Sequence, residues 1–364
     1  MRRTVRTIRY ARTWVTGRSE VRESLLTVER ETGPVRARLV LPAGLPAPYP
    51  AWILLHGVTR PGFDHPQLVR FSRALATSGA AVVIPEVAEW KDLRLAPEAA
   101  LPTIVHAIRL LQGVPEVEDD RYGLMGFSFG GPHALVTAAH EEVAHHLAGV
   151  VSFGGYCDLE RTVRFQLTGR HEWGGRVHRV RPDPYGRWIV GANFLTSAPG
   201  YGDAVDVAQA LWELAAHAAE KRAPAWSPRY DVLKEGLRRG VAPARRELFD
   251  LFAPASGRDA DEEAAEALIG PLIEGGRRVA PLAEPAPFLG RIRHPVELLH
   301  GRGDRLIPYT ESLRMQRSLP RDARAHVTVT RLFAHSTGER FPILRGASEG
   351  LMFFRALKRI LGTV

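Results

Sequence analysis

The chain has 364 residues, of which 45% are hydrophobic and 24% charged. This balance is typical of folded globular proteins and excludes a globally disordered chain. No stretch approaches the roughly 18 apolar residues that a membrane-spanning helix needs, which excludes an integral membrane protein. The single cysteine, Cys157, excludes an intramolecular disulfide and a cysteine-based metal cluster. The length fits one large domain with an insertion, or two domains.

The net charge of +9 would be compatible with binding to nucleic acid or to an anionic membrane. However, the basic residues are spread along the chain among acidic ones, and no nucleic-acid recognition motif accompanies them. The first 18 residues are rich in arginine, so they form either a basic arm on the surface or an organellar transit peptide. No apolar stretch follows Arg2-Arg3, so neither a Sec nor a twin-arginine export signal is supported, and between the other two we favour the arm. We expect a cytoplasmic protein with neither a nucleic-acid nor a membrane partner, and a homo-oligomer remains possible.

Short apolar runs alternate with helical patterns over residues 24–155 and again over 293–361. The predicted strands are 25–28, 35–41, 52–55, 81–84, 122–125, 150–153, 296–299 and 326–332, and the predicted helices between and after them are 66–78, 98–112, 129–140, 310–319 and 347–361. Continuous apolar runs such as Trp52–Leu55 are typical of strands that are buried on both faces. The alternation therefore predicts a doubly wound α/β fold with a mostly parallel sheet.

Residues 157–290 interrupt this alternation. Helical patterns cover 203–222, 231–252 and 259–273, and the last two of these stretches contain no clear strand signal. A segment of roughly 130 residues is too long for a loop without structure. We predict a core formed by 1–156 and 291–364, and a helical cap domain formed by 157–290.

The sharpest local motif is Gly126-Phe127-Ser128-Phe129-Gly130-Gly131, between the predicted strand 122–125 and the helix that follows it. In a G-x-S-x-G motif of this kind, a serine on a strained turn presents its hydroxyl above the edge of a sheet. The flanking glycines allow the strand and the helix to approach closely. The motif predicts that Ser128 is a nucleophile.

A serine nucleophile needs a base, a carboxylate that orients the base, and donors for the oxyanion. Asp304 follows the strand 296–299, and His335 follows the strand 326–332, so both are expected at the carboxyl edge of the sheet. The order serine, aspartate, histidine agrees with the order in which this fold uses them. The backbone N–H groups of Val58 and Phe129 are the candidate oxyanion donors.

Some of these residues have competitors. Asp158, just after the strand 150–153, is the alternative acid, and His56 is expected to shape the oxyanion loop rather than to act as the base. His133 is expected to be a packed neighbour of the site. The histidines at 140, 145 and 146 lack the further ligands of a metal site. The arginines between 161 and 181 are either a solvated surface or a contact for an anionic substrate group.

The segments Leu55-His56-Gly57-Val58, Gly126–Gly131, His300–Asp304 and His335 resemble the α/β-hydrolase superfamily, most closely its dienelactone-hydrolase and prolyl-oligopeptidase side. The resemblance covers about 24–155 and 293–361 and implies an eight-stranded sheet. Dienelactone hydrolases use a cysteine where this chain has Ser128. Prolyl-oligopeptidase-type enzymes usually have a large N-terminal propeller, whereas few residues here precede the first strand, so an ester substrate is expected rather than a peptide.

The expected reaction is therefore hydrolysis of a carboxylic ester through an acyl-enzyme, with a small-molecule ester as the substrate and without a metal or an organic cofactor. A peptidase, a thioesterase or an acyltransferase could use the same triad. A ligand-binding protein on a hydrolase scaffold is the alternative from a different class. The cap is expected to lie over the catalytic edge, where its aromatic residues would line an apolar pocket.

Overall fold

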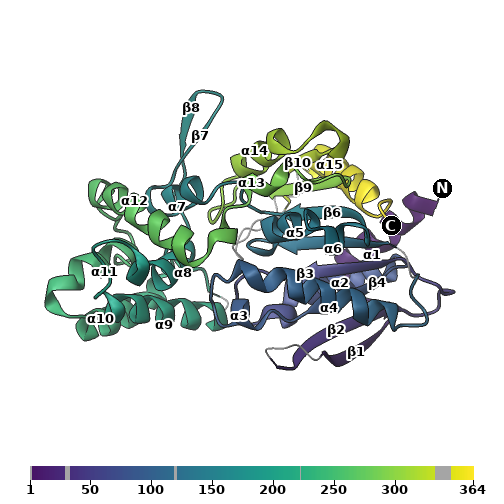
Figure 1. Cartoon of the computed structure of the whole chain (residues 1–364), viewed down its shortest axis with the longest axis horizontal. Helices are drawn as coiled ribbons and strands as arrows, with labels where there is room; N and C mark the ends of the chain where they lie inside the picture. Colours follow the sequence, from purple (N-terminus) through teal and green to yellow (C-terminus); the bar gives the residue numbers. More distant parts are fainter. Residues whose placement is uncertain (1, 29–32, 119–120, 222, 333–345) are drawn as a thin grey trace.

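The computed structural model describes residues 2–28, 33–118, 121–221, 223–332 and 346–364. An eight-stranded sheet forms the core of one half of the molecule, with the strand order β1-β2-β4-β3-β5-β6-β9-β10 (Figure 1). The strands are β1 (Val21–Val28), β2 (Val35–Pro42), β3 (Ala51–Leu55), β4 (Ala81–Pro85), β5 (Tyr122–Phe127), β6 (Leu147–Phe153), β9 (Val296–Gly301) and β10 (His326–Thr330). β2 pairs antiparallel with both β1 and β4, and the remaining pairs are parallel. The prediction of a mostly parallel, eight-stranded sheet is confirmed.

Helices cover both faces of the sheet, as the buried strands require. Odd and even residues of each strand belong to two separate apolar clusters: Ile53 and Val83 face one side, and Trp52 and Val82 face the other. The side of Trp52 is covered by α1 (Arg2–Thr16), α2 (Pro66–Thr77) and α15 (Gly346–Ile360). The side of Ile53 is covered by α4 (Ala100–Gln112), α5 (Gly130–Ala138) and α14 (Thr310–Ser318). The short helices α3 (Ala88–Lys91) and α6 (Glu141–Ala144) lie in connections.

The parallel strands end at the same level, which places the segments that follow them along one edge. Phe127 of β5 is in register with Phe153 of β6, and Phe153 is in register with Leu299 of β9. Leu299 pairs in turn with Thr328 of β10. The chain therefore leaves β5, β6, β9 and β10 along one carboxyl edge, where an open α/β sheet binds its ligands.

The segment between β6 and β9 is mainly helical. It contains α7 (Leu159–Thr168), α8 (Pro184–Phe194), α9 (Val205–Lys221), α10 (Asp231–Gly240), α11 (Arg246–Phe252), α12 (Glu262–Val279) and α13 (Ala286–Leu289). We call this segment, from α7 to α13, the insertion. It also contains an unexpected antiparallel hairpin, β7 (Arg170–Trp173) and β8 (Arg176–Arg179), which projects from the body of the molecule (Figure 1). The sequence predicted a helical insertion, and the hairpin at 170–179 departs from that expectation.

The arginine-rich N-terminus forms a packed helix. Thr7, Tyr10 and Thr13 of α1 are buried, and the Tyr10 ring meets Phe71 of α2 edge-to-face at 5.6 Å. The Arg6 guanidinium donates to the carbonyl of Val364, so the two ends of the chain lie together (Figure 1). The basic arm on the surface therefore has a defined helical structure, which we did not predict.

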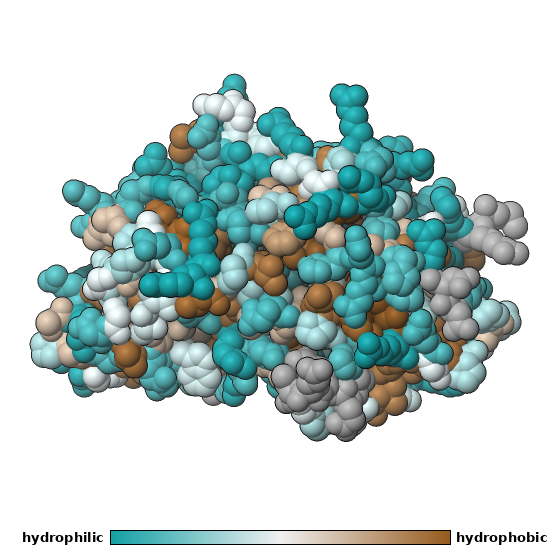
Figure 2. Space-filling view, viewed as in Figure 1, coloured by the Kyte–Doolittle hydropathy of each residue, from teal (hydrophilic) through white to brown (hydrophobic). Residues whose placement is uncertain are grey.

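Polar and charged side chains cover most of the face seen in Figure 2, with smaller apolar areas between them. Many of the arginines pair with acidic residues, as Arg245 does with Asp206 at 2.8 Å and Arg179 with Glu262 at 2.9 Å. Within the described ranges, no helix combines the length and the apolar character that are needed to cross a membrane.

Candidate active site

Ser128 stands on a strained turn between β5 and α5. Its backbone has φ = 54°, in the left-handed region that a residue with a side chain rarely adopts. Two hydrogen bonds hold the turn: the Ser128 N–H donates to the carbonyl of Phe153 at 2.8 Å, and the Gly131 N–H donates to the carbonyl of Ser128 at 2.9 Å. Ser128 is half-buried. The turn therefore has the backbone conformation and position that the motif predicts.

The glycines around Ser128 are required by close contacts. A Cβ at Gly126 would overlap the carbonyl oxygen of Gly130, and a Cβ at Gly130 would lie 2.6 Å from the carbonyl oxygen of His56. A Cβ at Gly57 would lie 3.0 Å from the Cβ of Ser128. The loop after β3 therefore packs directly against the turn that carries Ser128.

The loop after β3 is held by His56, which is buried. The Val87 N–H donates to Nε2 of His56 at 3.0 Å, so the proton of the ring lies on Nδ1, which donates to the carbonyl of Gly57 at 2.7 Å. Burial lowers the pKa of His56 to about 4, which keeps the ring neutral. Because both ring nitrogens are occupied, His56 is not available as a base. This agrees with the expectation that it shapes the loop.

The carbonyl of Gly57 and the N–H of Val58 belong to one peptide unit, so the hydrogen bond from His56 also orients that N–H. Phe129, whose side chain is buried, follows Ser128 directly and occupies the N-cap position of α5. In the part of the chain that the structure describes, neither the Val58 N–H nor the Phe129 N–H donates to a backbone carbonyl. Both remain candidates for oxyanion donors.

Asp304 lies in the loop after β9 and is 4% exposed. Its Oδ1 accepts hydrogen bonds from the N–H groups of Leu306 at 2.9 Å and Ile307 at 3.1 Å. His300, which is fully buried, approaches Oδ2 with its Nε2 at 3.4 Å. The carboxylate is thus held in a fixed orientation at the carboxyl edge of the sheet.

The predicted base, His335, lies outside the described residues. The described chain reaches the same edge on β10, because Thr330 at the end of β10 pairs with Gly301 at the end of β9. The Arg302 N–H extends this ladder by donating to the carbonyl of Thr330 at 2.7 Å. The loop of Asp304 and the end of β10 therefore start side by side.

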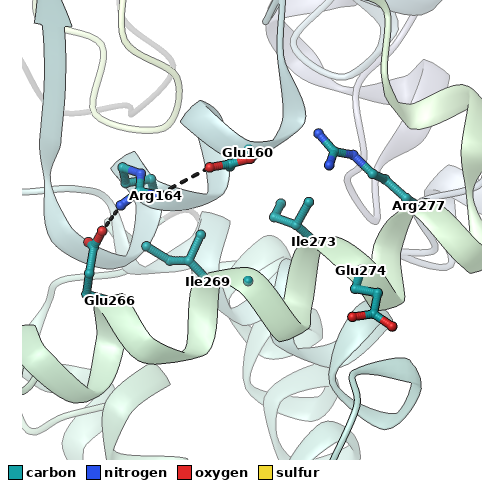
Figure 3. A pocket seen from close by; sticks show the side chains of 8 residues that line it. Glu160, Arg164, Glu266, Ile269, Ile273, Glu274 and Arg277 are labelled. Carbon is teal, nitrogen blue, oxygen red and sulfur yellow. Dashed lines mark hydrogen bonds and ion pairs between the residues drawn. The ribbon is translucent and has the colours of Figure 1, made fainter.

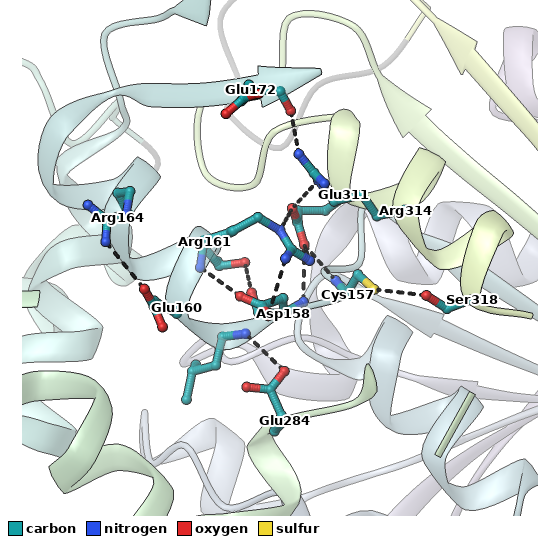
Figure 4. A network of polar contacts seen from close by, with 12 residues as sticks. Cys157, Asp158, Glu160, Arg161, Arg164, Glu172, Glu284, Glu311, Arg314 and Ser318 are labelled. Carbon is teal, nitrogen blue, oxygen red and sulfur yellow. Dashed lines mark hydrogen bonds and ion pairs between the residues drawn. The ribbon is translucent and has the colours of Figure 1, made fainter. Parts of the chain in front are cut away.

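The alternative acid, Asp158, has a structural role at the start of the insertion. Its side chain caps α7 by accepting from the Arg161 N–H at 2.8 Å. Figure 4 shows the network around it, whose centre is Glu311 of α14. Glu311 is 1% exposed and accepts from the N–H groups of Cys157 at 3.1 Å and Asp158 at 3.0 Å, and from Nε of Arg161 at 2.9 Å. This network fixes the chain where it enters the insertion.

The insertion contacts the loops of the site through α8. The hydroxyl of Tyr185 donates to the carbonyl of Val58 at 3.3 Å. The Asp183 N–H, just before α8, donates to the carbonyl of Arg305 at 2.7 Å. The first turn of α8 is therefore attached both to the oxyanion loop and to the residue beside Asp304. In the sequence, Tyr185 was only one of several aromatic residues, and nothing there distinguished it.

A further attachment of the insertion to the core lies farther along α8, at Asn193. Its side-chain amide accepts from the Leu95 N–H at 2.9 Å and donates to the carbonyl of Leu93 at 2.9 Å. Leu93 is buried and has φ = 63°, another strained position. These two hydrogen bonds hold the strained loop, which follows β4, against the insertion.

His133 lies in α5, the helix that follows Ser128, and is 1% exposed. Its ring contacts Phe129, with ring centres 4.3 Å apart, and its Nε2 lies 3.4 Å from the hydroxyl of Tyr156. Burial lowers the pKa of His133 to about 3, so the ring is neutral at ordinary pH. It is a packed neighbour of the site, as expected. Among the described residues, no group of three or more histidine, cysteine, aspartate or glutamate side chains is arranged to hold a metal ion.

A separate groove of about 330 Å³ lies in the insertion between α7 and α12 (Figure 3). Ile269 and Ile273 line it, and Arg164 forms an ion pair with Glu160 along α7 and another with Glu266 of α12. All of its lining residues belong to α7 and α12, so it is distinct from the loops at the edge of the sheet.

No known protein-family model and no curated protein matches this sequence. The fold of this chain is similar to that of several solved structures. Dipeptidyl peptidase 4 from Porphyromonas gingivalis aligns with 97% of this chain and 37% of its own longer chain, at 10% identity and a TM-score of 0.51. Est1E from Butyrivibrio proteoclasticus aligns over 90% of this chain and 97% of its own, at 14% identity and a TM-score of 0.49. Brefeldin A esterase, a bacterial homologue of human hormone-sensitive lipase, aligns over 95% and 77%, at 14% identity and a TM-score of 0.47.

At these identities the likeness establishes the fold and nothing beyond it. The sheet order, the helices on both faces and the similarity to dipeptidyl peptidase 4 identify the α/β-hydrolase fold, as the sequence motifs predicted. Because this fold supports many activities, the function has to be argued from the site itself.

Proposed function

We propose that the protein is a serine hydrolase that cleaves carboxylic esters through an acyl-enzyme. In this mechanism His335 removes the proton of Ser128, and Ser128 attacks the ester carbonyl. The N–H groups of Val58 and Phe129 stabilise the oxyanion. The alcohol leaves with the proton from His335, and a water molecule that His335 activates then releases the acid. Asp304 holds the imidazole in the required tautomer.

The observation that carries the proposal is the backbone strain at Ser128. A φ of 54° for a buried-edge serine has a free-energy cost, on the order of 1–3 kcal/mol, and such strain is concentrated at functional positions. Here it lifts the serine out of the line of β5 at the edge where the chain also reaches Asp304. Leu93 has a similar φ without a proposed role, so the strain supports a nucleophile only together with the glycine motif around Ser128 and its place at the carboxyl edge.

We further propose that the insertion is a cap over this edge, as the predicted division into a core and a cap domain implies. The attachments of α8 to Val58 and Arg305 support this. A cap in this position would exclude water from the acyl-enzyme and would select the acyl or the alcohol group.

Ser128→Ala tests the nucleophile. We expect kcat for p-nitrophenyl butyrate to fall by roughly 10⁴-fold or more, while Tm stays nearly unchanged. Ser72→Ala is the matched control, because Ser72 is a buried serine of α2 that hydrogen-bonds only locally, to Val69. A fluorophosphonate probe should label the wild type and the control but not Ser128→Ala. Retained activity and labelling in Ser128→Ala would refute the assignment.

The same triad can act on amides and thioesters, so the substrate class needs its own experiment. Rates on p-nitrophenyl esters, aminoacyl amides and acyl-CoA, measured side by side, separate an esterase from a peptidase and a thioesterase. Product analysis with added alcohols or amines detects acyl transfer. A protein that neither turns over any of these compounds nor takes up the fluorophosphonate would be a ligand-binding member of the fold.

A further inference from the structure

Tyr185, in the first turn of α8, reaches from the insertion to the loop that carries a proposed oxyanion donor. Its hydroxyl donates to the carbonyl of Val58 at 3.3 Å. Burial of the phenol raises its pKa, so the hydroxyl stays protonated at neutral pH and is available as a donor. The proposed mechanism makes no use of this contact, although the contact lies on the same residue as the oxyanion N–H.

Two peptide units meet at the Cα of Val58, and each is held by a side chain. The unit between Gly57 and Val58 contains the oxyanion N–H, and His56 holds it through the carbonyl of Gly57 at 2.7 Å. The unit that follows Val58 contains the carbonyl that Tyr185 holds. Because peptide units are planar and only two backbone torsions at Val58 join them, holding both units restricts the direction of the N–H.

The loop that is held in this way lies beside the nucleophile. A Cβ added at Gly57 would lie 3.0 Å from the Cβ of Ser128 and 3.6 Å from its Oγ. An oxyanion donor acts only when it is aimed at the place where the negative charge develops, so a small displacement of the loop weakens it. Since the oxyanion forms after substrate binding, such a displacement lowers kcat more than it raises KM.

The first turn of α8 is also fixed from the side of the acid. The Asp183 side chain caps the helix, and its Oδ1 accepts from the Tyr185 N–H at 3.1 Å. The Asp183 N–H donates to the carbonyl of Arg305, the neighbour of Asp304, at 2.7 Å. A continuous line of hydrogen bonds therefore runs from the loop of the proposed acid, through the start of α8, to Val58.

We propose that Tyr185 is a positioning residue for the oxyanion N–H of Val58, so that the site is fully active only while the first turn of α8 contacts the core. This inference rests on the proposed function for the role of the oxyanion, but the hold of Tyr185 on the loop does not depend on hydrolysis. Tyr185 itself takes no part in proton transfer or in the bond-breaking steps. The insertion then contributes to the rate of the chemical step in addition to covering the site.

Tyr185→Phe removes the hydroxyl and keeps the ring. We expect kcat for p-nitrophenyl butyrate to fall by roughly 5- to 30-fold while KM stays within about twofold. The loss should be smaller than the roughly 10²- to 10³-fold that follows the outright removal of an oxyanion donor, because the N–H is displaced and not deleted. An unchanged kcat, or a rise in KM that accounts for the whole loss of activity, would overturn the proposal.

Two control variants separate positioning from a general loss of packing. Tyr230→Phe removes another hydroxyl of the insertion, which donates to the carbonyl of Ala223 at 3.1 Å. Trp212→Phe removes a different bond between the insertion and the core, from Nε1 to the carbonyl of Asp92 at 3.0 Å. Both controls should keep kcat within about twofold. A loss in either control as large as that in Tyr185→Phe would overturn the proposal.

A transition-state analogue gives a result that a purely structural role would not change. With octyl trifluoromethyl ketone, Oγ of Ser128 bonds to the carbonyl carbon, its proton passes to His335, and the carbonyl oxygen becomes the oxyanion. Tyr185→Phe should weaken inhibition by this ketone by the same factor as it lowers kcat/KM. Inhibition by octyl methyl ketone, which binds without adding to the serine, should change little. Equal weakening of both ketones would overturn the proposal.

Hydrogen exchange measured by mass spectrometry on the full chain needs no turnover. Tyr185→Phe should exchange faster than the wild type in the peptide 57–62, where the Gly62 N–H donates to the carbonyl of Thr59 at 2.9 Å, and Tyr230→Phe should not. Unchanged exchange in Tyr185→Phe would overturn the hold of Tyr185 on the loop. If the wild type neither hydrolyses esters nor takes up the fluorophosphonate, the proposed function fails, and the exchange rates still decide whether Tyr185 holds the loop.

Discussion

The carboxyl edge of the sheet and the insertion that borders it hold their residues in place by different means. At the edge, backbone geometry does this: Ser128 is strained, Gly126 and Gly130 have no room for a side chain, and a ladder of N–H bonds joins neighbouring strands. In the insertion, side chains do most of it: Tyr185 and Asn193 each reach across to a loop of the core, beside one backbone bond from Asp183 to Arg305. Residues of the edge are therefore recognisable from local sequence, whereas contacts of the insertion depend on how its helices pack.

The largest difference between the two regions is expected in kcat, when the proposed acid of the triad, Asp304, is replaced. Asp304→Asn should lower kcat by roughly 10³- to 10⁴-fold with little change in Tm, because the amide oxygen can still accept from Leu306 and Ile307 while the imidazole loses its carboxylate. Steady-state kinetics on an activated ester measure this. Asp158→Asn is the matched control and should leave kcat within a few-fold, since Asp158 caps α7. The reverse result would transfer the role of the acid to Asp158, at the start of the insertion.

The next effect concerns glycine. Gly126→Ala should lower the free energy of unfolding by roughly 3–5 kcal/mol, because the new Cβ would overlap the backbone of Gly130. In the insertion, Gly236 lies inside α10 with open space where a Cβ would be, and Gly236→Ala should stabilise the protein by roughly 0.5–1 kcal/mol. Urea denaturation of both variants gives the comparison. A Gly126→Ala protein with the stability of the wild type would show that the turn of Ser128 is not closely packed.

The smallest expected effect is on the free energy of unfolding; it depends on pH and concerns His133 of α5. Its pKa is about 3 in the folded protein and 6.5 in an unfolded chain. Between these values the unfolded chain binds a proton that the folded one does not, so stability is complete above about pH 6.5 and falls as the pH decreases. From pH 7 to pH 5 this histidine should account for a loss of about 2 kcal/mol.

His133→Leu should remove that part of the loss, which urea unfolding at the two pH values measures. His145→Leu is the control. From pH 7 to pH 5 its free energy of unfolding should fall as much as that of the wild type, since the His145 side chain is exposed in the folded protein. An unchanged pH dependence in His133→Leu would mean that this ring is accessible to protons in the folded state.

Most of the core could be predicted from the sequence, because strands that are buried on both faces produce continuous apolar runs and parallel strands bring their following loops to one edge. The predicted strands and helices of the core agree with the described ones to within a few residues, β1 excepted, which starts earlier, at Val21, whereas α1, α3 and α6 were not predicted. The neutral state of His56 could not be predicted, since it depends on burial and on a hydrogen bond from Val87, which is distant in the sequence. The orientation of Asp304 depends on local bonds from Leu306 and Ile307, which the sequence analysis did not use.

The insertion was predicted less well, for identifiable reasons. The hairpin β7–β8 turns at Gly174 and Gly175, both with positive φ, and this pair of glycines between alternating residues is a hairpin signal that we did not use. The helix expected over 231–252 is divided at 241–245, where Pro243 starts a new turn. The helix expected to end at 273 continues through Pro271 to Val279.

The N–H bonds along the carboxyl edge have a consequence for how this protein can diversify. Ser128 is bound to Phe153, and Gly154 is bound to Leu299 at 2.8 Å, so the reactive turn, the root of the insertion and the strand before Asp304 form one continuous backbone unit. We expect that sequence beyond the cap of α7 can be lengthened or shortened without displacing the hydroxyl, provided that the contacts of α8 with Val58 and Arg305 are kept. Under the proposed function, chemistry and substrate preference would then be encoded by separable stretches of one polypeptide.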